Sequence, residues 1–296
     1  IYNLQEHNDE LHVMVPQELL QSFSGDQSIL YGASAMLRWM HDHRTPRRQF
    51  RLPWKMLFMG FRGFDWERCL TTNTLGGESP FTPDFSEPMP FFKNISDQVL
   101  YLQRGVGKLA NTAEPLRSPV AILWSPWNDY ISRLSRPGGR DVDGQTSEKF
   151  PFSGSWLYNT SYDFGAHHDC LALLKSLRIR GTFVAPEDVI NGDLEKRGFK
   201  ALMLPYSKGM SLEEAAAIRK FVKNGGLVIA DNTPGIYSRF GRGLEESRLA
   251  DLFPDMGRTS VISVGKGHAA YVHEQICGYL KRMEACDRKG SDEVAS

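Results

Sequence analysis

The sequence predicts an α/β fold, and its second half gives the clearest evidence. Between Ala201 and Pro234 the chain reads as strand, helix, strand, with the apolar runs ALMLP and LVIA on either side of an amphipathic segment. Further apolar runs of strand length alternate with helical patterns before and after this unit. Strands that alternate with helices along a chain pair in parallel through crossover connections, so parallel sheets are expected.

The second half predicts a doubly wound parallel sheet, flavodoxin-like in outline. Its expected strands are Val120–Trp124, Thr182–Ala185, Ala201–Pro205, Leu227–Ala230 and a last one near Val261–Val264 or His268–Val272. The expected helices are Tyr162–Leu177 and Leu212–Asn224. Ser211 and Glu214 have the spacing of a capping box at the start of the second helix, and Gly225 ends it.

The first half predicts fewer elements, in the order strand, helix, helix, strand, loop, helix. These are the strand Leu11–Pro16, the helices Ser34–His41 and Gln49–Met59, the strand Phe64–Trp66, the loop Gly76–Pro90 and the helix Phe91–Ala110. The pattern suits a barrel or an open α/β sheet. The Pro-bounded stretch Ala113–Pro119 reads as a linker. The predicted domains are therefore 1–112 and 113–275, followed by a charged tail, 276–296.

Composition narrows the class of protein. Thirty-five basic and 35 acidic residues give a formal net charge of +0, so neither nucleic acid nor an anionic membrane is an expected partner. No apolar run approaches the ~18 residues of a membrane span. The 4 cysteines show no metal-ligand spacing and are too scattered for a disulfide framework, which suits a cytoplasmic protein without a metal. The chain starts at Ile1 rather than Met, and we expect a fragment of a longer protein.

Aromatic side chains are frequent, at 11% of the sequence. The 6 tryptophans all lie in the first 156 residues, at Trp39, Trp54, Trp66, Trp124, Trp127 and Trp156. Such rings stack on sugars when they line a cleft, or they pack in cores and interfaces. The sequence leaves both readings open.

The turn after the strand Leu227–Ala230 is where many α/β enzymes carry a nucleophile, yet here it reads Asp231-Asn232-Thr233-Pro234. An amidotransferase would need G-x-C-x-G with a His partner. Cys170 instead lies within an amphipathic helix and is expected to be a buried thiol. His167 and His168 read as a polar helix start rather than a metal site. Gly265–His268 reads as a hairpin turn, because the context of a phosphate loop is missing.

Candidate catalytic groups therefore come from the first half. In parallel α/β folds, working residues cluster at the carboxyl ends of strands. Glu18 follows the first predicted strand, and Asp65 to Arg68 end the second. A carboxylate on a barrel rim can attack an anomeric carbon. Without further context, a Glu at the end of a strand is more often a helix cap or a surface residue.

Three stretches of the first half resemble the last barrel strands of glycoside hydrolase family 42 (GH42) β-galactosidases. They are P-Q-E-L-L-Q-S-F-S-G, M-L-F-M-G-F-R-G-F-D-W-E-R and G-G-E-S-P-F-T-P-D-F. The second half, through K-A-L-M-L-P-Y-S, the capped helix and L-V-I-A-D, resembles the middle domain of that family. This middle domain has a class I glutamine-amidotransferase-like fold and serves trimer formation. The resemblance covers about residues 12–255.

The resemblance implies a partial (β/α)8 barrel followed by an amidotransferase-like domain, and retaining hydrolysis of a β-galactoside without a cofactor. It implies Glu18 as the nucleophile and Trp66, Arg68 and Glu78 as substrate-binding residues. The acid/base Glu is expected upstream of Ile1, so the fragment alone is expected to be inactive. A homotrimer is the implied assembly. The alternative, from a different class, is a non-catalytic carbohydrate-binding or assembly protein with the same fold.

Overall fold

A computed structural model of the protein describes residues 14–24, 30–32, 51, 53–54, 57–58, 60, 63–65, 90–113, 118–134, 162–273, 276, 278–279 and 282–283. The chain divides into two compact units. Unit 1 comprises Ile1–Leu19 and Arg117–Ser296, and unit 2 comprises Leu20–Leu116. Each unit is described by itself, and the predicted domain boundaries stay a prediction.

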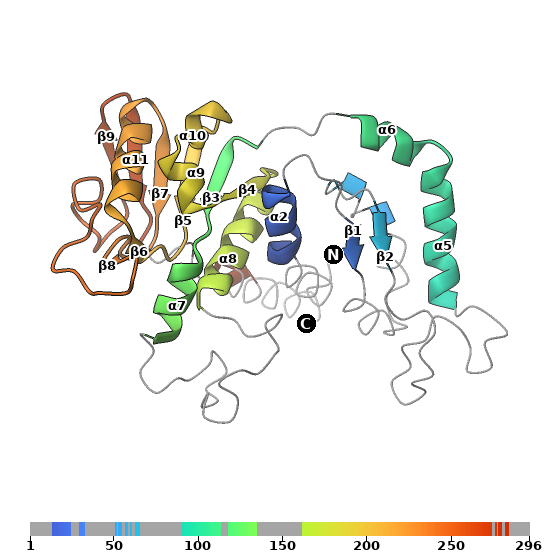
Figure 1. Ribbon diagram of the computed structural model, residues 1–296, viewed down its shortest axis with the longest axis horizontal. Helices are drawn as coiled ribbons and strands as arrows, with labels where there is room; N and C mark the ends of the chain where they lie inside the picture. The colour runs from blue at the N-terminus through green and yellow to red at the C-terminus, as the bar shows by residue number, and fades with distance from the viewer. Residues whose placement is uncertain are drawn as a thin grey trace, which may run out of the picture. The chain divides into compact units, whose positions relative to one another are not determined.

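Unit 1 contains a six-stranded sheet in the order β4-β3-β5-β7-β10-β9 (Figure 1). The strands are β3 Val120–Leu123, β4 Gly181–Val184, β5 Ala201–Leu204, β7 Leu227–Ala230, β9 Ser260–Val264 and β10 Gly267–Tyr271. All neighbours pair in parallel except β9 and β10, which form an antiparallel pair. The fold is therefore α/β with a mostly parallel central sheet, as the sequence predicts.

The predicted strands of the second half agree with the observed ones to within about a residue. The last strand had two candidate positions, and both are strands: β9 and β10 form a hairpin around Gly265 and Lys266. The hairpin turn predicted for Gly265–His268 is thereby confirmed. The central strands are apolar throughout because both faces of the sheet are covered.

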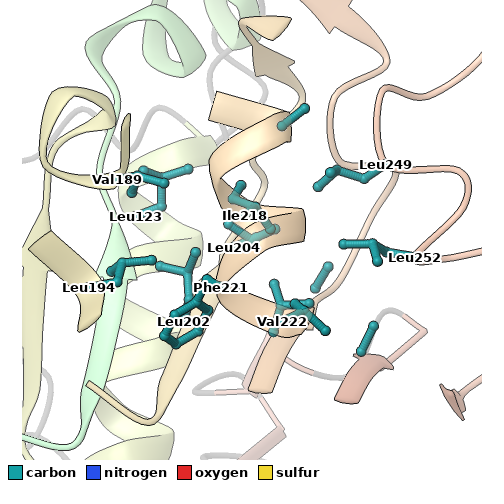
Figure 2. Close-up of a cluster of buried hydrophobic side chains, with 14 of the residues drawn as sticks. Leu123, Val189, Leu194, Leu202, Leu204, Ile218, Phe221, Val222, Leu249 and Leu252 are labelled. Atoms are coloured by element: carbon teal, nitrogen blue, oxygen red, sulfur yellow. The ribbon is translucent and has the colours of Figure 1, made fainter. Parts of the chain in front are cut away.

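One face of the sheet packs against α9 Pro186–Ile190, α10 Asp193–Lys196 and α11 Leu212–Lys223, which lie side by side in Figure 1. Ile218, Phe221 and Val222 of α11 point toward Leu202 and Leu204 of β5 in Figure 2. The predicted capping box is confirmed. Ser211 Oγ accepts from the Glu214 N–H at 3.0 Å, and the Glu214 carboxylate accepts from the Ser211 N–H at 2.6 Å.

The opposite face packs against α8 Tyr162–Ser176 and the first half of α2 Met14–Phe23. Val15 of α2 is fully buried there, in a cluster with Ile122 of β3, Phe183 of β4 and Cys170 of α8. Helices therefore cover both faces of the sheet.

Besides the short helices α9 and α10, three elements of unit 1 were not predicted from the sequence. They are α7 Pro126–Leu134 and the short strands β6 Gly209–Met210 and β8 Tyr237–Ser238, which pair in parallel beyond the main sheet. Strands of two residues leave no periodic pattern in a sequence. Asn128 connects α7 to β6, since its Oδ1 accepts a hydrogen bond from the Gly209 N–H at 2.6 Å.

Unit 2 contains a parallel pair of short strands, β1 Leu30–Gly32 and β2 Gly63–Asp65, with the helices α5 Pro90–Gln103 and α6 Val106–Thr112. The strand predicted at Phe64–Trp66 is confirmed for Phe64 and Asp65. The single helix predicted for Phe91–Ala110 is in fact two, because the chain turns at Arg104 and Gly105. Glycine favours such an interruption because it is a poor helix former.

The strand predicted at Leu11–Pro16 is wrong for the residues that the structure describes. Met14, Val15 and Pro16 open the helix α2. Val15 and Leu19, one helical turn apart, both pack on the sheet of unit 1, and this helical spacing outweighs the short apolar run. Pro16 lies in the first turn, where its missing N–H has no helical partner to lose. The strand that pairs with β2 is Leu30–Gly32 instead.

Candidate functional site

Glu18, the predicted nucleophile, lies in the middle of α2 and not at the end of a strand. Its side chain is buried, and its Oε1 accepts hydrogen bonds from Arg180 Nε at 3.1 Å and Nη2 at 3.0 Å. Both residues belong to unit 1. The structural premise of the assignment, a strand-end carboxylate, is therefore wrong, while the catalytic role itself stays a prediction.

The position of Arg180 is set by the segment between α8 and β4. Ser118 contacts it from the segment that leads into β3, through a hydrogen bond from its hydroxyl to the Arg180 carbonyl oxygen. The Arg180 side chain is 37% exposed, whereas that of Glu18 is 9% exposed. The ion pair thus lies at the rim of the core, with its carboxylate inside and its guanidinium partly in solvent.

Two opposing effects act on the Glu18 carboxyl group. Burial raises its pKa, because a charge is poorly solvated in the protein interior, and the charge and hydrogen bonds of Arg180 lower it. Burial is the larger effect, so the pKa lies above its ordinary value of 4.5. A nucleophile must be ionised, and in this arrangement Arg180 is the group that favours the ionised form.

The other predicted site residues, Trp66, Arg68 and Glu78, lie outside the described residues. Of the helix predicted at Gln49–Met59, the described part that includes Trp54, Leu57 and Phe58 is helical, and the chain turns at Gly60. The Trp54 Nε1–H donates to Gln98 Oε1 of α5 at 2.9 Å, which joins this run to the helix that follows in unit 2.

The turn after β7, where the sequence has no nucleophile, contains a residue with positive φ and a buried aspartate. Asn232 has a φ of 59°, and Tyr206, at the end of the neighbouring strand β5, has a φ of 48°. Asp231 is fully buried, and its Oδ1 accepts from the Tyr206 N–H at 3.4 Å. Positive φ is uncommon for residues other than glycine, and here it bends two adjacent strand ends around one carboxylate. Asp231 thus ties the two turns together.

The reactive residue types near this edge are buried. Cys170 is inaccessible, and burial raises the pKa of its thiol well above the ordinary value, with Asp231 and Asp169 adding to the effect. His167 makes a 2.9 Å hydrogen bond through Nε2 to the Leu123 carbonyl oxygen. The prediction that Cys170 is a buried structural thiol is confirmed.

The described residues show neither a candidate metal cluster nor a candidate membrane span. No group of three or more His, Cys, Asp and Glu side chains in the described part of the chain is placed to hold a metal ion. None of the helices in that part is both long enough and apolar enough to cross a membrane.

Solved β-galactosidases share the fold. The enzyme from Bacillus circulans sp. alkalophilus matches with a TM-score of 0.66 at 12% identity, over 95% of this chain and 48% of its own. The cold-adapted enzyme from Rahnella sp. R3 matches with a TM-score of 0.61 at 10% identity, over 94% and 48%. Gan42B, a GH42 β-galactosidase of G. stearothermophilus, matches with a TM-score of 0.53 at 16% identity, over 82% and 40%.

These matches confirm the predicted resemblance to GH42 β-galactosidases at the level of the fold. The chain spans less than half the length of these three proteins. No family model matches the chain, and no curated protein matches it in sequence. What these matches show of the chain is therefore its α/β fold, which it shares with part of each of these enzymes.

Sequence reasoning missed Arg180, the partner of Glu18. The two residues are 162 positions apart, and no local pattern relates an arginine before a strand to a distant helix. A buried carboxylate requires a cation or several donors, but the burial of Glu18 is known only from the structure, so the sequence held no signal for Arg180.

Proposed function

We propose that this chain is part of a retaining glycoside hydrolase that acts on β-galactosides. The observation that supports the proposal most directly is the shared fold with β-galactosidases over 82% to 95% of this chain. The motifs in the first half point to the same class. Because the chain spans under half of each such protein, the activity is proposed for the longer protein.

In this proposal, unit 2 and the segment before it contribute the last part of a (β/α)8 barrel. Glu18 attacks the anomeric carbon, and Trp66, Arg68 and Glu78 bind the sugar. Retaining hydrolysis requires a second carboxyl group about 5–5.5 Å from the nucleophile to protonate the leaving oxygen and then activate water. By the resemblance, that acid/base Glu belongs to an earlier barrel strand, so residues 1–296 alone should not turn over substrate.

Unit 1 is proposed to serve as an amidotransferase-like assembly domain that forms a homotrimer. The strand order β4-β3-β5-β7 corresponds to 2-1-3-4 in chain order, which is the flavodoxin-like arrangement. The turn after β7 supports a structural role, since Asp231 is buried and bonded where an enzyme would expose a nucleophile. Light scattering of the purified chain measures the assembly, and a monomer at micromolar concentration argues against it.

The decisive experiment is a chromogenic β-galactoside assay on the full-length protein, wild type and Glu18→Gln. Loss of turnover in a variant that is still folded at the assay temperature, by far-UV circular dichroism, supports Glu18 as the nucleophile. Undiminished turnover in the variant refutes that assignment. Detectable hydrolysis by residues 1–296 refutes the proposed inactivity of the fragment.

The alternative, a non-catalytic carbohydrate-binding or assembly protein, is favoured by one observation. The Glu18 carboxylate has a structural partner, Arg180, which accounts for its burial without any catalytic role. A full-length protein that binds β-galactosides but hydrolyses none of them would establish this alternative.

A further inference from the structure

An aromatic group lies on the surface of unit 1 near α7. The Trp127 ring centroid is 6.2 Å from that of Tyr130 and 6.0 Å from that of Phe240, which follows β8. Phe240 is 84% exposed and Tyr130 is 58% exposed. Clustered exposed aromatic side chains mark binding surfaces more often than isolated ones do. We call this group, with Arg239, Glu187 and Glu214, the Trp127 patch.

Arg239 lies at the centre of the Trp127 patch. Its guanidinium carbon is 5.2 Å from the Trp127 ring centroid, within cation–π range. Its Nη2 donates to Glu187 Oε1 of α9 at 3.2 Å. The patch therefore combines an aromatic surface with charged groups contributed by several elements.

Two buried polar atoms of the Trp127 patch lack a hydrogen-bond partner among the described residues. They are Oε1 of Glu214 and Nε of Arg239. Glu214 is 2% exposed, and its other oxygen, Oε2, accepts from the Ser211 N–H in the capping box. A buried polar atom without a partner costs about 1–3 kcal/mol, so an acceptor and a donor left open in one patch indicate a missing group.

Glu214 and Arg239 are also electrostatically coupled. Burial raises the pKa of the Glu214 carboxyl group. The hydrogen bonds with Ser211 and the Arg239 charge oppose this effect, while the Glu187 charge adds to it. The open acceptor and the open donor therefore belong to two groups whose charges act on one another.

Charge argues for a neutral ligand. The carboxylates and guanidiniums that act on one another around the patch are Glu187, Glu213 and Glu214, and Arg239 and Arg248. Because the positive charges do not exceed the negative ones, the patch has no preference for a phosphate or a carboxylate. The Trp127 ring is inclined to Tyr130 by 53° and to Phe240 by 70°, so these rings offer no parallel faces between which a planar base could stack.

We propose that the Trp127 patch binds a neutral pyranose sugar. A sugar hydroxyl can donate to Glu214 Oε1 and accept from Arg239 Nε, whereas an apolar partner can do neither. The C–H face of the ring would pack on the exposed aromatic side chains. The Arg239 side chain is 35% exposed, so part of it is open to a ligand in solvent.

This site goes beyond the proposed function, because it lies in unit 1 and uses none of Glu18, Trp66, Arg68 and Glu78. It gives unit 1 a carbohydrate-binding role of its own. Binding there requires no hydrolysis. Sugar binding at the Trp127 patch can therefore be measured even if the full-length protein has no β-galactosidase activity.

The test is isothermal titration calorimetry of the full chain with methyl β-galactopyranoside, methyl β-glucopyranoside and methyl β-xylopyranoside. We expect binding of at least one of them up to about 100 mM, a range that detects millimolar dissociation constants. Phe240→Ala should weaken it by about two- to tenfold, the effect of losing one aromatic contact. Arg239→Ala should weaken it by a similar factor or more, because it removes the open donor.

Leu109→Ala is the matched control, since Leu109 is an exposed apolar side chain of α6 in unit 2. It should leave the binding unchanged. Phe240 is so exposed that its removal should not unfold the chain, which far-UV circular dichroism verifies.

Three outcomes would overturn the proposal. The first is no binding of any of the three glycosides, as expected if the open atoms hold only a water molecule. The second is wild-type affinity in Phe240→Ala and Arg239→Ala. The third is an oligomer that Phe240→Ala dissociates in light scattering, which would identify the occupant of the patch as a second copy of this chain.

Discussion

Replacing Glu18 and Arg180, singly and together, tests whether their ion pair fastens α2 to the sheet of unit 1. The variants are Glu18→Gln, Arg180→Gln and the double substitution. In the wild type, two guanidinium donors reach one buried carboxylate oxygen at 3.0 and 3.1 Å. Each single variant removes one charge and leaves the other without its partner.

The expected magnitude follows from the burial of the pair. Exposed ion pairs contribute about 0.2–1 kcal/mol, and breaking a fully buried pair costs about 3–5 kcal/mol. Here the Glu18 side chain is 9% exposed and the Arg180 side chain is 37% exposed, so the pair lies between these limits. We expect each single variant to lose about 1–2 kcal/mol, a fall of roughly 2–8 °C in the melting temperature, and the double-mutant cycle to give a coupling energy of about the same size.

The pH dependence measures the burial of Glu18, the effect that opposes the ion pair. Burial raises the pKa of the folded-state Glu18 carboxyl group above its ordinary value of 4.5. The folded state therefore binds this proton more tightly than the unfolded state. The resulting stability is fully present below the unfolded pKa and is lost as the pH rises through the folded pKa. In Glu18→Gln this part of the pH profile should disappear.

The assay is urea unfolding followed by tryptophan fluorescence at several pH values, with the double-mutant cycle evaluated at pH 7. A coupling energy below about 0.3 kcal/mol is within the range of simple additivity and would refute the docking role. A Glu18→Gln variant of normal stability that abolishes galactosidase activity in the full-length protein would likewise contradict it, and would favour the nucleophile assignment.

Three further predictions concern the rest of unit 1. Phe221→Ala should lower the free energy of unfolding by about 3–5 kcal/mol in urea titrations, because this ring is buried on α11; Leu212→Ala, at an exposed position, should change it by less than about 0.5 kcal/mol. Cys170 should react with a thiol reagent only in urea, since it is fully buried. Rapid labelling of Cys170 itself in the native chain would contradict its placement. Arg219 lowers the pKa of Asp251, so Asp251→Asn should lower the free energy of unfolding by about 0.2–1 kcal/mol at pH values above the ordinary pKa of 3.8. This difference should vanish as the pH falls through the folded-state pKa. Equal melting temperatures of variant and wild type at pH 7 would count against this ion pair.

Sequence reasoning predicted the sheet of unit 1 because its strands carry the signal themselves. β5 and β7 are covered on both faces, so their sequences are unbroken apolar runs. The start of α11 is marked by the Ser211–Glu214 capping box. The same reasoning failed at Leu11–Pro16, because a short apolar run suits a strand and a packed helix equally. It also missed β1, which is only three residues long.

The candidate site was less predictable than the fold. The motifs predicted a functional role for Glu18. Its environment, however, depends on Arg180, which is distant in the chain and close in space. The Trp127 patch illustrates the same limit. Its aromatic residues are visible in the sequence, whereas their grouping with Arg239 and Glu214 requires α7, α11 and the turn after β8 to be folded.

The sequence by itself therefore determined the α/β class, the principal strands of unit 1 and the resemblance to GH42 β-galactosidases. Each of these is encoded by local spacing of apolar, capping and turn residues. Only the tertiary structure decided that Glu18 lies within a helix against Arg180, that Asp231 closes the turn where a nucleophile could have been, and that Arg239 and Glu214 leave a donor and an acceptor open beside exposed rings. The physical reason is that charge pairing, burial and hydrogen-bond satisfaction depend on residues that the fold alone brings together.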